Sequence, residues 1–324
     1  MWTIGVDIGG SHTKLGVVNQ LGEISHFRRI ASDVTVAAQP CLARLLDLIE
    51  TLRAKCPEQI AGIGLSLHGY VDTARRGPII CPNTPALNGL DLHQLLEDRC
   101  RLPVIINNDL TAHVLAEYHF GNGRGARRFL CLAIGTGLGA GVIVDGKALR
   151  YVGGCAGDTG HIILQPGGPT CAMGCRGCAE ALCGVAGIER LARTQLGRQV
   201  TADEVIAGAA AGLPEMTAIM EQIGSWLGLT CASLCAIFLP DRVALTGGVA
   251  EAGEVLLDGC RRKFQEVVGD YHRTAAALAG DYYSGVDFVL GEMRGQTGVV
   301  GAVVEFFQQE ASDEQQNNRA DWRG

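Results

Sequence analysis

Two glycine-rich segments, each set between two short apolar stretches, constrain the fold of this chain most. The first is DIGGSHTK at 7–14, and the second is GTGLGAG at 135–141. The apolar stretches on either side of each segment are predicted to be β-strands. Glycines between two strands allow backbone N–H groups to approach an anion closely. The repeat therefore predicts two α/β units, each of which supplies one loop for a polyphosphate.

The first loop also carries side chains suited to a nucleotide phosphate. Asp7 can orient a hydrated magnesium ion, and Thr13 and Lys14 add a hydroxyl and a positive charge. The segment lacks the terminal Gly-Lys-Ser of a P-loop. Taken alone, it fits a plain hairpin turn equally well, and the second glycine loop is what favours phosphate binding.

The size and charge of the chain narrow the class of protein. Its 324 residues predict two domains rather than one. With 47% hydrophobic and 19% charged residues, the chain has ample apolar material for its cores. A net charge of −7 argues against a general nucleic-acid binder.

The sequence also predicts a cytoplasmic location. A strand is expected at residues 2–6, which leaves no room for a secretory leader. No apolar run in the sequence approaches the ~18 residues that a membrane span needs. The thirteen cysteines are scattered and odd in number, so reduced thiols are expected rather than disulfides.

A cysteine-rich segment, residues 153–180, predicts a metal site. Cys171, Cys175 and Cys178 lie close together among glycines, and His161 precedes them. Three thiolates and one imidazole form an ordinary ligand set of a closed tetrahedral zinc site. Cysteines that share a loop by chance are the alternative. A redox or acyl-transfer enzyme that uses Cys175 and Cys178 is a further alternative, but it leaves both glycine loops unexplained.

Two strand ends supply further candidates. Asn108 and Asp109 end a predicted strand and open a helix over 110–120, where an α/β sheet commonly has its crevice. A simple helix cap is the alternative for this pair. Gly247 and Gly248 follow another predicted strand and are expected to start a helix. This glycine pair would allow a flat nucleoside to lie against the backbone.

These segments together resemble the ROK family of sugar kinases and sugar-responsive regulators over nearly the whole chain. The matching segments, in the family's order, are DIGGSHTKLG (7–16), GIGLSLHGYVD (62–72), PNTP (82–85), NND (107–109), GTGLGAGVI (135–143), GGCAGDTGH (153–161), CAMGCRGCAE (171–180) and LTGGVA (245–250). The resemblance implies an α/β fold of two domains, the actin-like ATPase (ribonuclease H-like) fold, with the active site in the interdomain cleft. It places a small domain at 1–110 with a C-terminal helix at about 298–324, and a larger domain with the second phosphate loop and the zinc loop at 111–297.

By the same resemblance, Asp109 is the catalytic base that takes the proton of the sugar hydroxyl. The residues implied to contact the sugar are Asn83, Thr84, Asn108, Asp158, His161 and Glu180. Those implied to hold the ATP phosphates are Asp7, Gly9, Gly10, Ser11, Gly135, Thr136 and Gly137, with Thr13 and Lys14 beside them, and Gly247 and Gly248 border the adenosine. The implied magnesium ion on the phosphates is distinct from the structural zinc ion.

The chain departs from the family's pattern at two functional positions. Asp158 stands where the family usually has Glu, so the carboxylate that faces the sugar is one methylene shorter. Met173 stands at the family's second zinc-ligand position, and a thioether is a poor zinc ligand. If the loop curls differently, Cys175 completes the ligand set in its place; otherwise zinc is absent or has a non-protein ligand. Residues 86–90 also lack a Trp that many members carry, which leaves the sugar unspecified.

The predicted function is an ATP-dependent sugar kinase that phosphorylates the primary hydroxyl of a hexose or N-acetylhexosamine. The alternative is a non-catalytic sugar-sensing regulator of the same family. Such regulators carry an additional N-terminal DNA-binding domain, for which the residues before the first strand leave no room. The expected partners are a small-molecule sugar and a second copy of the chain, since dimers are common in the family. No nucleic acid or membrane partner is expected.

Overall fold

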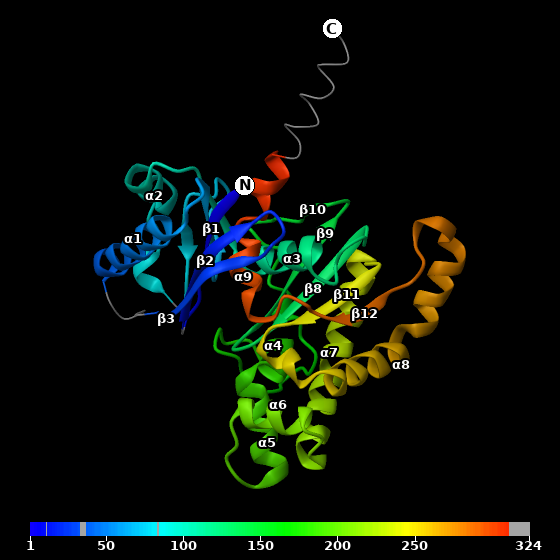
Figure 1. The fold of residues 1–324 in the computed structure, drawn as a ribbon. Coiled ribbons are helices and arrows are strands. Elements are labelled where there is room, and N and C mark those ends of the chain that lie inside the picture. The colour runs from blue at the N-terminus through cyan, green and yellow to red at the C-terminus, as the bar shows by residue number, and fades with distance from the viewer. Residues whose placement is uncertain (11, 33–36, 83, 311–324) are drawn as a thin grey trace. The chain divides into compact units, whose positions relative to one another are not determined.

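The structure is a computed structural model that describes residues 1–10, 12–32, 37–82 and 84–310 (Figure 1). Ser11, Asn83 and the end of the predicted C-terminal helix lie outside the described residues. Contacts divide the chain into two units: unit 1 comprises 1–120, 150–155 and 296–324, and unit 2 comprises 121–149 and 156–295. The domain boundaries predicted from the sequence stay a prediction, and the units are described separately below.

Unit 1 contains a five-stranded mixed sheet in the order β3-β2-β1-β4-β7. Its strands are β1 (Trp2–Ile8), β2 (His12–Asn19), β3 (Ile24–Ala31), β4 (Ile60–Leu67) and β7 (Val104–Asn108). The first three strands form an antiparallel meander, while β4 runs parallel to β1 and β7 runs parallel to β4. The register places Asp7 of β1 opposite both Lys14 of β2 and Ser66 of β4.

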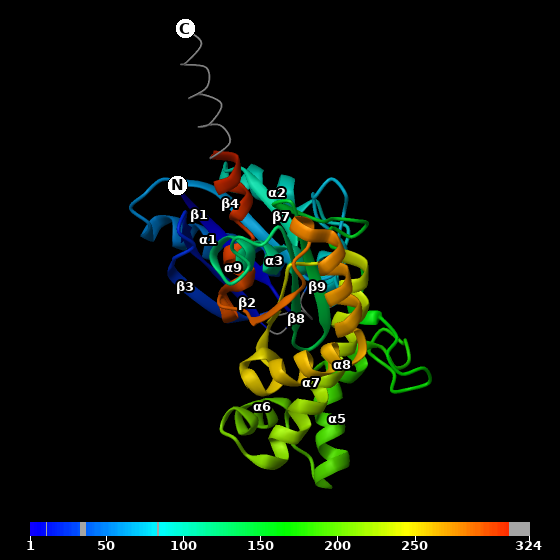
Figure 2. The ribbon, with the colours of Figure 1, turned by 90° about the vertical axis from the view of Figure 1, so that its right-hand side faces the viewer.

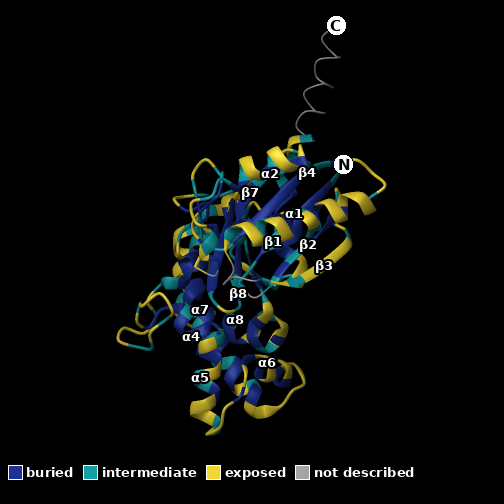
Figure 3. Cartoon of the chain, turned by 90° about the vertical axis from the view of Figure 1, so that its left-hand side faces the viewer, coloured by how far each residue is buried: buried dark blue, intermediate teal, exposed yellow. Residues whose placement is uncertain are grey.

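Helices cover both faces of this sheet. They are α1 (Ala38–Lys55), α2 (Leu92–Cys100), α3 (Asp109–Phe120) and α9 (Thr297–Gly301), and residues 304–310 are also helical. Figure 3 shows dark blue buried strands behind the largely yellow outer surfaces of α1 and α2. Helix α1 buries Leu45, Ile49 and Leu52, whose spacing places them on one face. The smaller elements are β5 (Tyr70–Val71), β6 (Pro78–Ile80) and η1 (Pro85–Leu87).

Two strand glycines allow the C-terminal segment to pack closely on the sheet. A Cβ atom on Gly5 would lie 2.1 Å from the carbonyl oxygen of Val299, and one on Gly64 would lie 2.1 Å from that of Ala302. Any side chain at either position would push this segment off the sheet. Residues near the two ends of the sequence therefore share one core.

Unit 2 repeats the strand arrangement of unit 1. Its sheet has the order β10-β9-β8-β11-β12. The strands are β8 (Arg128–Ile134), β9 (Leu138–Val144), β10 (Lys147–Ala148), β11 (Arg242–Thr246) and β12 (Asp287–Leu290). β8 and β9 form an antiparallel hairpin, and β11 and β12 continue the sheet in parallel. The predicted strand, glycine loop and strand are thus present in both units.

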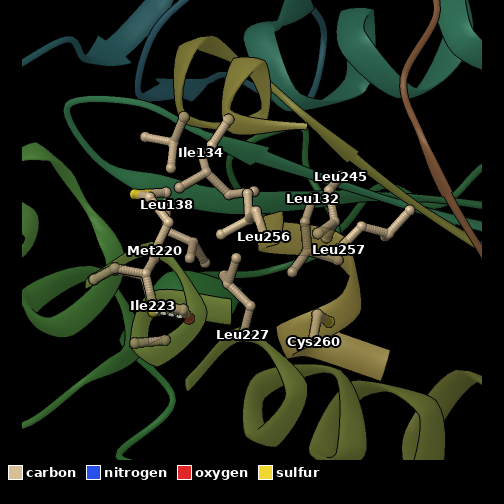
Figure 4. Close-up of a cluster of buried hydrophobic side chains, with 14 of the residues drawn as sticks. Leu132, Ile134, Leu138, Met220, Ile223, Leu227, Leu245, Leu256, Leu257 and Cys260 are labelled. Atoms are coloured by element: carbon tan, nitrogen blue, oxygen red, sulfur yellow. Dashed lines mark hydrogen bonds between the residues drawn. The ribbon is translucent and has the colours of Figure 1, made fainter. Parts of the chain in front are cut away.

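Two long helices build the core of unit 2 against this sheet. The helices of this unit are α4 (Ala179–Cys183), α5 (Val185–Leu196), α6 (Ala202–Ala210), α7 (Pro214–Phe238) and α8 (Glu254–Ala279), with short η2 (Thr159–His161), η3 (Gly248–Ala252) and η4 (Gly280–Tyr282) turns. Figure 2 shows α7 and α8 side by side. Leu227 of α7 and Leu256 of α8 lie in one cluster with Leu132 of the sheet (Figure 4).

The helix expected to start at Gly247 and Gly248 is the short 3-10 helix η3, which begins at Gly248 with Gly247 as its N-cap. The long helix α8 begins at Glu254. Gly253 separates the two elements with a φ of +74°, a conformation that ends helical geometry.

Among the described helices of the whole chain, none has the length and hydropathy needed to cross a bilayer.

Candidate active site and metal centre

Asp109 lies where β7 ends and α3 begins, in unit 1. Its Oδ1 accepts the backbone N–H of Leu110 at 2.9 Å, and its Oδ2 lies 3.3 Å from Nδ1 of His68. The side chain remains 28% exposed, in contrast to the apolar β7 residues before it. A carboxylate that is oriented on both oxygens and partly open to solvent can accept a proton from a bound ligand.

Asn108 precedes this carboxylate and is almost fully buried. Its Oδ1 accepts the N–H groups of Leu110 and Thr111 at 2.9 and 3.3 Å, which caps α3. Its Nδ2 donates to the carbonyl oxygen of Gly69 at 2.7 Å. Asn108 therefore caps α3, as the helix-cap alternative predicted. The predicted contact with the sugar would use the second hydrogen of its Nδ2.

Asn107 belongs to a largely buried ionic cluster that sequence reasoning missed. Glu305 receives hydrogen bonds from Arg75 at 2.5 Å, Arg150 at 3.1 Å and Asn107 at 3.0 Å. Both arginines also donate to Oδ1 of Asn107, at 2.9 and 3.1 Å. Burial raises the pKa of Glu305, but Arg75 and Arg150 outweigh it and hold this pKa below its usual value. The cluster ties the end of β7 to the C-terminal segment within unit 1.

We predict that Glu305→Gln lowers the free energy of unfolding by about 2 kcal/mol at pH 7, because it leaves two partly buried guanidinium groups without their counter-charge. Since the folded-state pKa of Glu305 lies below the ordinary 4.5, this stabilisation is present above that pH and is lost as pH falls through the lower value. Urea denaturation at pH 7 and at acid pH measures the difference. The exposed Glu50→Gln is the matched control, and an equally small effect at both sites would refute the prediction.

Asp7, the acid of the first glycine loop, is inserted among polar partners on neighbouring strands. Ser66 donates to its Oδ1 at 3.0 Å, and the ammonium of Lys14 lies 4.0 Å from its Oδ2. Burial raises the pKa of Asp7, with a smaller contribution from the charge of Asp109, while His113 and Lys14 act in the opposite direction. Gly298 makes room for this carboxyl, since a Cβ there would lie 2.4 Å from its carbon.

The other predicted residues of unit 1 lie around these groups. Gly9 closes the hairpin by donating its N–H to the His12 carbonyl at 3.1 Å, and Gly10 follows it in the loop. The buried Thr13 hydroxyl pairs with that of Ser32 at 2.9 Å. The Thr84 hydroxyl is also buried, 2.6 Å from the Cys81 sulfur. These hydroxyls therefore have protein partners before any ligand binds.

The second glycine loop is held from one side by α4 and α5. Gly135 accepts the N–H of Val185 at 3.0 Å, and Glu180 accepts the N–H of Leu138 at 3.3 Å. A Cβ on Gly137 would lie 2.6 Å from a Glu180 oxygen, so only glycine fits there without a shift. Thr136, between the two glycines, is exposed.

The glycine pair after β11 lies beside the same loop. Gly247 has a φ of +86°, and a Cβ there would lie 2.3 Å from the carbonyl oxygen of Ile134, the last residue of β8. Gly248 opens the η3 turn that follows. The structure therefore brings the predicted adenosine glycines and the second phosphate loop together in unit 2.

The structure groups the four predicted metal ligands. The ligand atoms of His161, Cys171, Cys175 and Cys178 all lie within 4.8 Å of one another. The Cys171 and Cys175 sulfurs are 3.2 Å apart, and Nδ1 of His161 lies 3.3 Å from the Cys175 sulfur. A tetrahedral zinc ion with Zn–S bonds of about 2.3 Å would set its sulfurs about 3.8 Å apart. The donor set and the grouping of its ligand atoms within 4.8 Å fit a closed Cys3His zinc site, in which these two sulfurs would lie slightly farther apart.

The local backbone explains why Cys175 rather than Met173 joins this cluster. The N–H of Cys171 donates to the carbonyl of Cys175 at 2.9 Å, and Gly174 turns the chain between them with a φ of +93°. The Met173 side chain is 66% exposed. Gly177 is required as well, because a Cβ there would lie 1.6 Å from the Gln165 carbonyl oxygen.

The cysteine loop connects the metal ligands to the second glycine loop. Cys178 is the N-cap of α4, and its sulfur accepts the N–H of Ala181 at 3.5 Å. Glu180, which contacts Leu138, lies in the first turn of this helix. His161 ends the η2 turn, which the exposed Asp158 precedes. A metal ion at the cluster would therefore fix both Glu180 and His161 in place.

Comparisons with known proteins agree with this architecture. A family model described as "ROK family" matches residues 3–308. A glucokinase from Streptomyces coelicolor is 28% identical over 93% of this chain and 96% of its own length. An N-acetylmannosamine kinase from Citrobacter koseri is 30% identical, with coverage of 78% and 85%. The crystal structure of a ROK glucokinase from Streptomyces griseus with glucose and AMPPNP has a TM-score of 0.78 at 27% identity, covering 95% of this chain and all of its own.

The fold is therefore the two-domain actin-like ATPase fold of the ROK sugar kinases. The chain belongs to the ROK family. The glucokinase relatives and the glucokinase structure with an ATP analogue support an ATP-dependent carbohydrate kinase.

Proposed function

We propose that this chain is an ATP-dependent sugar kinase that phosphorylates the primary hydroxyl of a hexose or N-acetylhexosamine, with Asp109 as its general base. The observation that carries the proposal is the partly exposed Asp109 carboxylate, held at the end of β7 by the Leu110 N–H and by His68. Such a carboxylate can accept the proton of a sugar hydroxyl as its oxygen attacks the γ-phosphate of ATP.

The residues proposed for the nucleotide come from both glycine loops. Gly9, Gly10 and the loop from Gly135 to Gly137 would present backbone N–H groups to the phosphates. Gly247 and Gly248 would border the adenosine. Asp7 would hold a hydrated magnesium ion, which would neutralise part of the phosphate charge. The ammonium of Lys14 lies 4.0 Å from this carboxylate and would add positive charge. In this chemistry, positioning and charge neutralisation supply most of the rate.

The proposed contacts with the sugar are Asn83, Thr84, Asn108, Asp158, His161 and Glu180. His161 directs Nδ1 to the cysteine sulfurs, so Nε2 is the ring nitrogen left for the sugar. Zinc, when bound by the Cys3His cluster, would be structural, because all four positions have protein ligands.

Release of ADP in the presence of a panel of hexoses, amino sugars and N-acetylated sugars tests this function. We expect ADP release that depends on one sugar or a small group of sugars. The competing function, a sugar-sensing regulator, predicts sugar binding by calorimetry without any sugar-dependent ADP release. Light scattering on the same sample tests the proposed homodimer.

A further inference from the structure

His68 is brought beside Asp109 by the pairing of two parallel strands. β4 and β7 are in register with Leu67 opposite Asn108, so the next residue on each strand lies at the same edge of the sheet. These next residues are His68 and Asp109, and Nδ1 of the imidazole lies 3.3 Å from Oδ2 of the carboxylate. The contact therefore follows from the sheet register and does not depend on a long loop.

The turn that carries His68 is fixed by its neighbours. Asn108 donates from Nδ2 to the carbonyl of Gly69 at 2.7 Å, and the Asn108 side chain is buried. Gly69 has a φ of +90°, and a Cβ there would lie 2.1 Å from the carbonyl oxygen of Ile80. The turn is thus clamped between β7 and β6, which limits the movement of the imidazole relative to Asp109.

The two oxygens of Asp109 have different surroundings. Oδ1 accepts the N–H of Leu110 at 2.9 Å, whereas Oδ2 has the imidazole of His68 as its partner. A carboxylate oxygen has two lone pairs, so Oδ2 can accept from His68 and still receive a second proton donor. Without the imidazole, rotation about the terminal torsion of Asp109 would be restrained by the Leu110 contact alone.

We infer that His68 is a positioning residue for the phosphoryl transfer: its Nδ1–H donates to Oδ2 of Asp109 and holds the carboxylate with a lone pair toward the sugar hydroxyl. The inference rests on the proposed role of Asp109 as the base. His68 acts through Asp109 and does not itself touch the reacting atoms. A hydrogen bond to a charged group is strong enough for its loss to lower kcat by about 10- to 100-fold.

Two substitutions in the full chain test this role. His68→Ala removes the donor, while His68→Asn keeps an N–H donor near the position of Nδ1 but cannot relay a proton. We expect His68→Ala to lower kcat by about 10- to 100-fold with an almost unchanged KM for the sugar. We expect His68→Asn to recover most of this loss. Thermal unfolding of each variant checks that the fold is retained.

The Asp109→Asn background shows whether His68 acts through the carboxylate. There, His68→Ala is expected to have no further effect on the residual rate. Three results would overturn the inference: a normal kcat in His68→Ala, a loss confined to KM, or a folded His68→Asn variant as slow as His68→Ala. If Asp109→Asn itself turns over normally, the proposed function fails; if Asp109→Asn is inactive and His68→Ala is normal, only the role of His68 fails.

Discussion

Replacing Asp109 by Asn is expected to lower kcat by about 10²–10⁴-fold, the usual contribution of a general base. Asn has the same shape, and its oxygen can still accept the Leu110 N–H that Asp109 accepts at 2.9 Å. Its amide cannot take a proton from the sugar hydroxyl, so the chemical step is affected rather than binding. Sugar binding by calorimetry and single-turnover phosphoryl transfer measure the two effects separately.

Asp98→Asn provides the matched control for this change. Asp98 is an exposed residue of α2, and its replacement by Asn removes the same charge from the same unit. It should leave both kcat and sugar binding unchanged. Turnover by Asp109→Asn within a few-fold of the unmodified chain would show that another group takes the proton.

The second large effect is expected at the metal cluster. We expect the unmodified chain to hold about one zinc ion, and Cys175→Ser to lose most of it. The hydroxyl of serine is a much poorer ligand for zinc than a thiolate. Because Cys178 caps the helix that carries Glu180, loss of the ion should also loosen Glu180 and lower the melting temperature. Metal analysis by mass spectrometry and thermal unfolding with and without chelator measure these effects.

Met173→Ser distinguishes the two possible ligand sets. Met173 is 66% exposed and is not one of the four proposed ligands, so its replacement should leave the zinc content unchanged. If Met173→Ser loses zinc while Cys175→Ser keeps it, the ligand set proposed here is wrong. If neither variant nor the unmodified chain binds zinc, the cluster is a group of reduced thiols.

The sequence predicted the elements of the candidate site whose signal is local. The two glycine loops are flanked by strands in both units, as their apolar neighbours indicated. The grouping of His161 with the three cysteines was also predicted from their spacing. Residues that lie close together in one glycine-rich loop can bring their side chains to a single metal ion. The family resemblance added the fold and the order of the motifs.

Contacts between distant segments could not be predicted in this way. Glu305 lies far along the chain from Arg75 and Arg150, and no local pattern connects a helical Glu to two arginines in other segments. His68 could have been found, because it follows one buried strand as Asp109 follows the next. Recognising it required the knowledge that β4 and β7 are neighbours in the sheet, which only the strand order supplies.

The most direct test of the central claim is the position of the phosphate in the product. The chain is incubated with ATP and its preferred sugar from the panel, and the product is examined by proton-coupled phosphorus NMR. Transfer to the primary hydroxyl predicts a phosphorus signal split by the two protons of one CH₂ group. Phosphate on a ring or anomeric hydroxyl, or ADP without any sugar phosphate, would contradict the account.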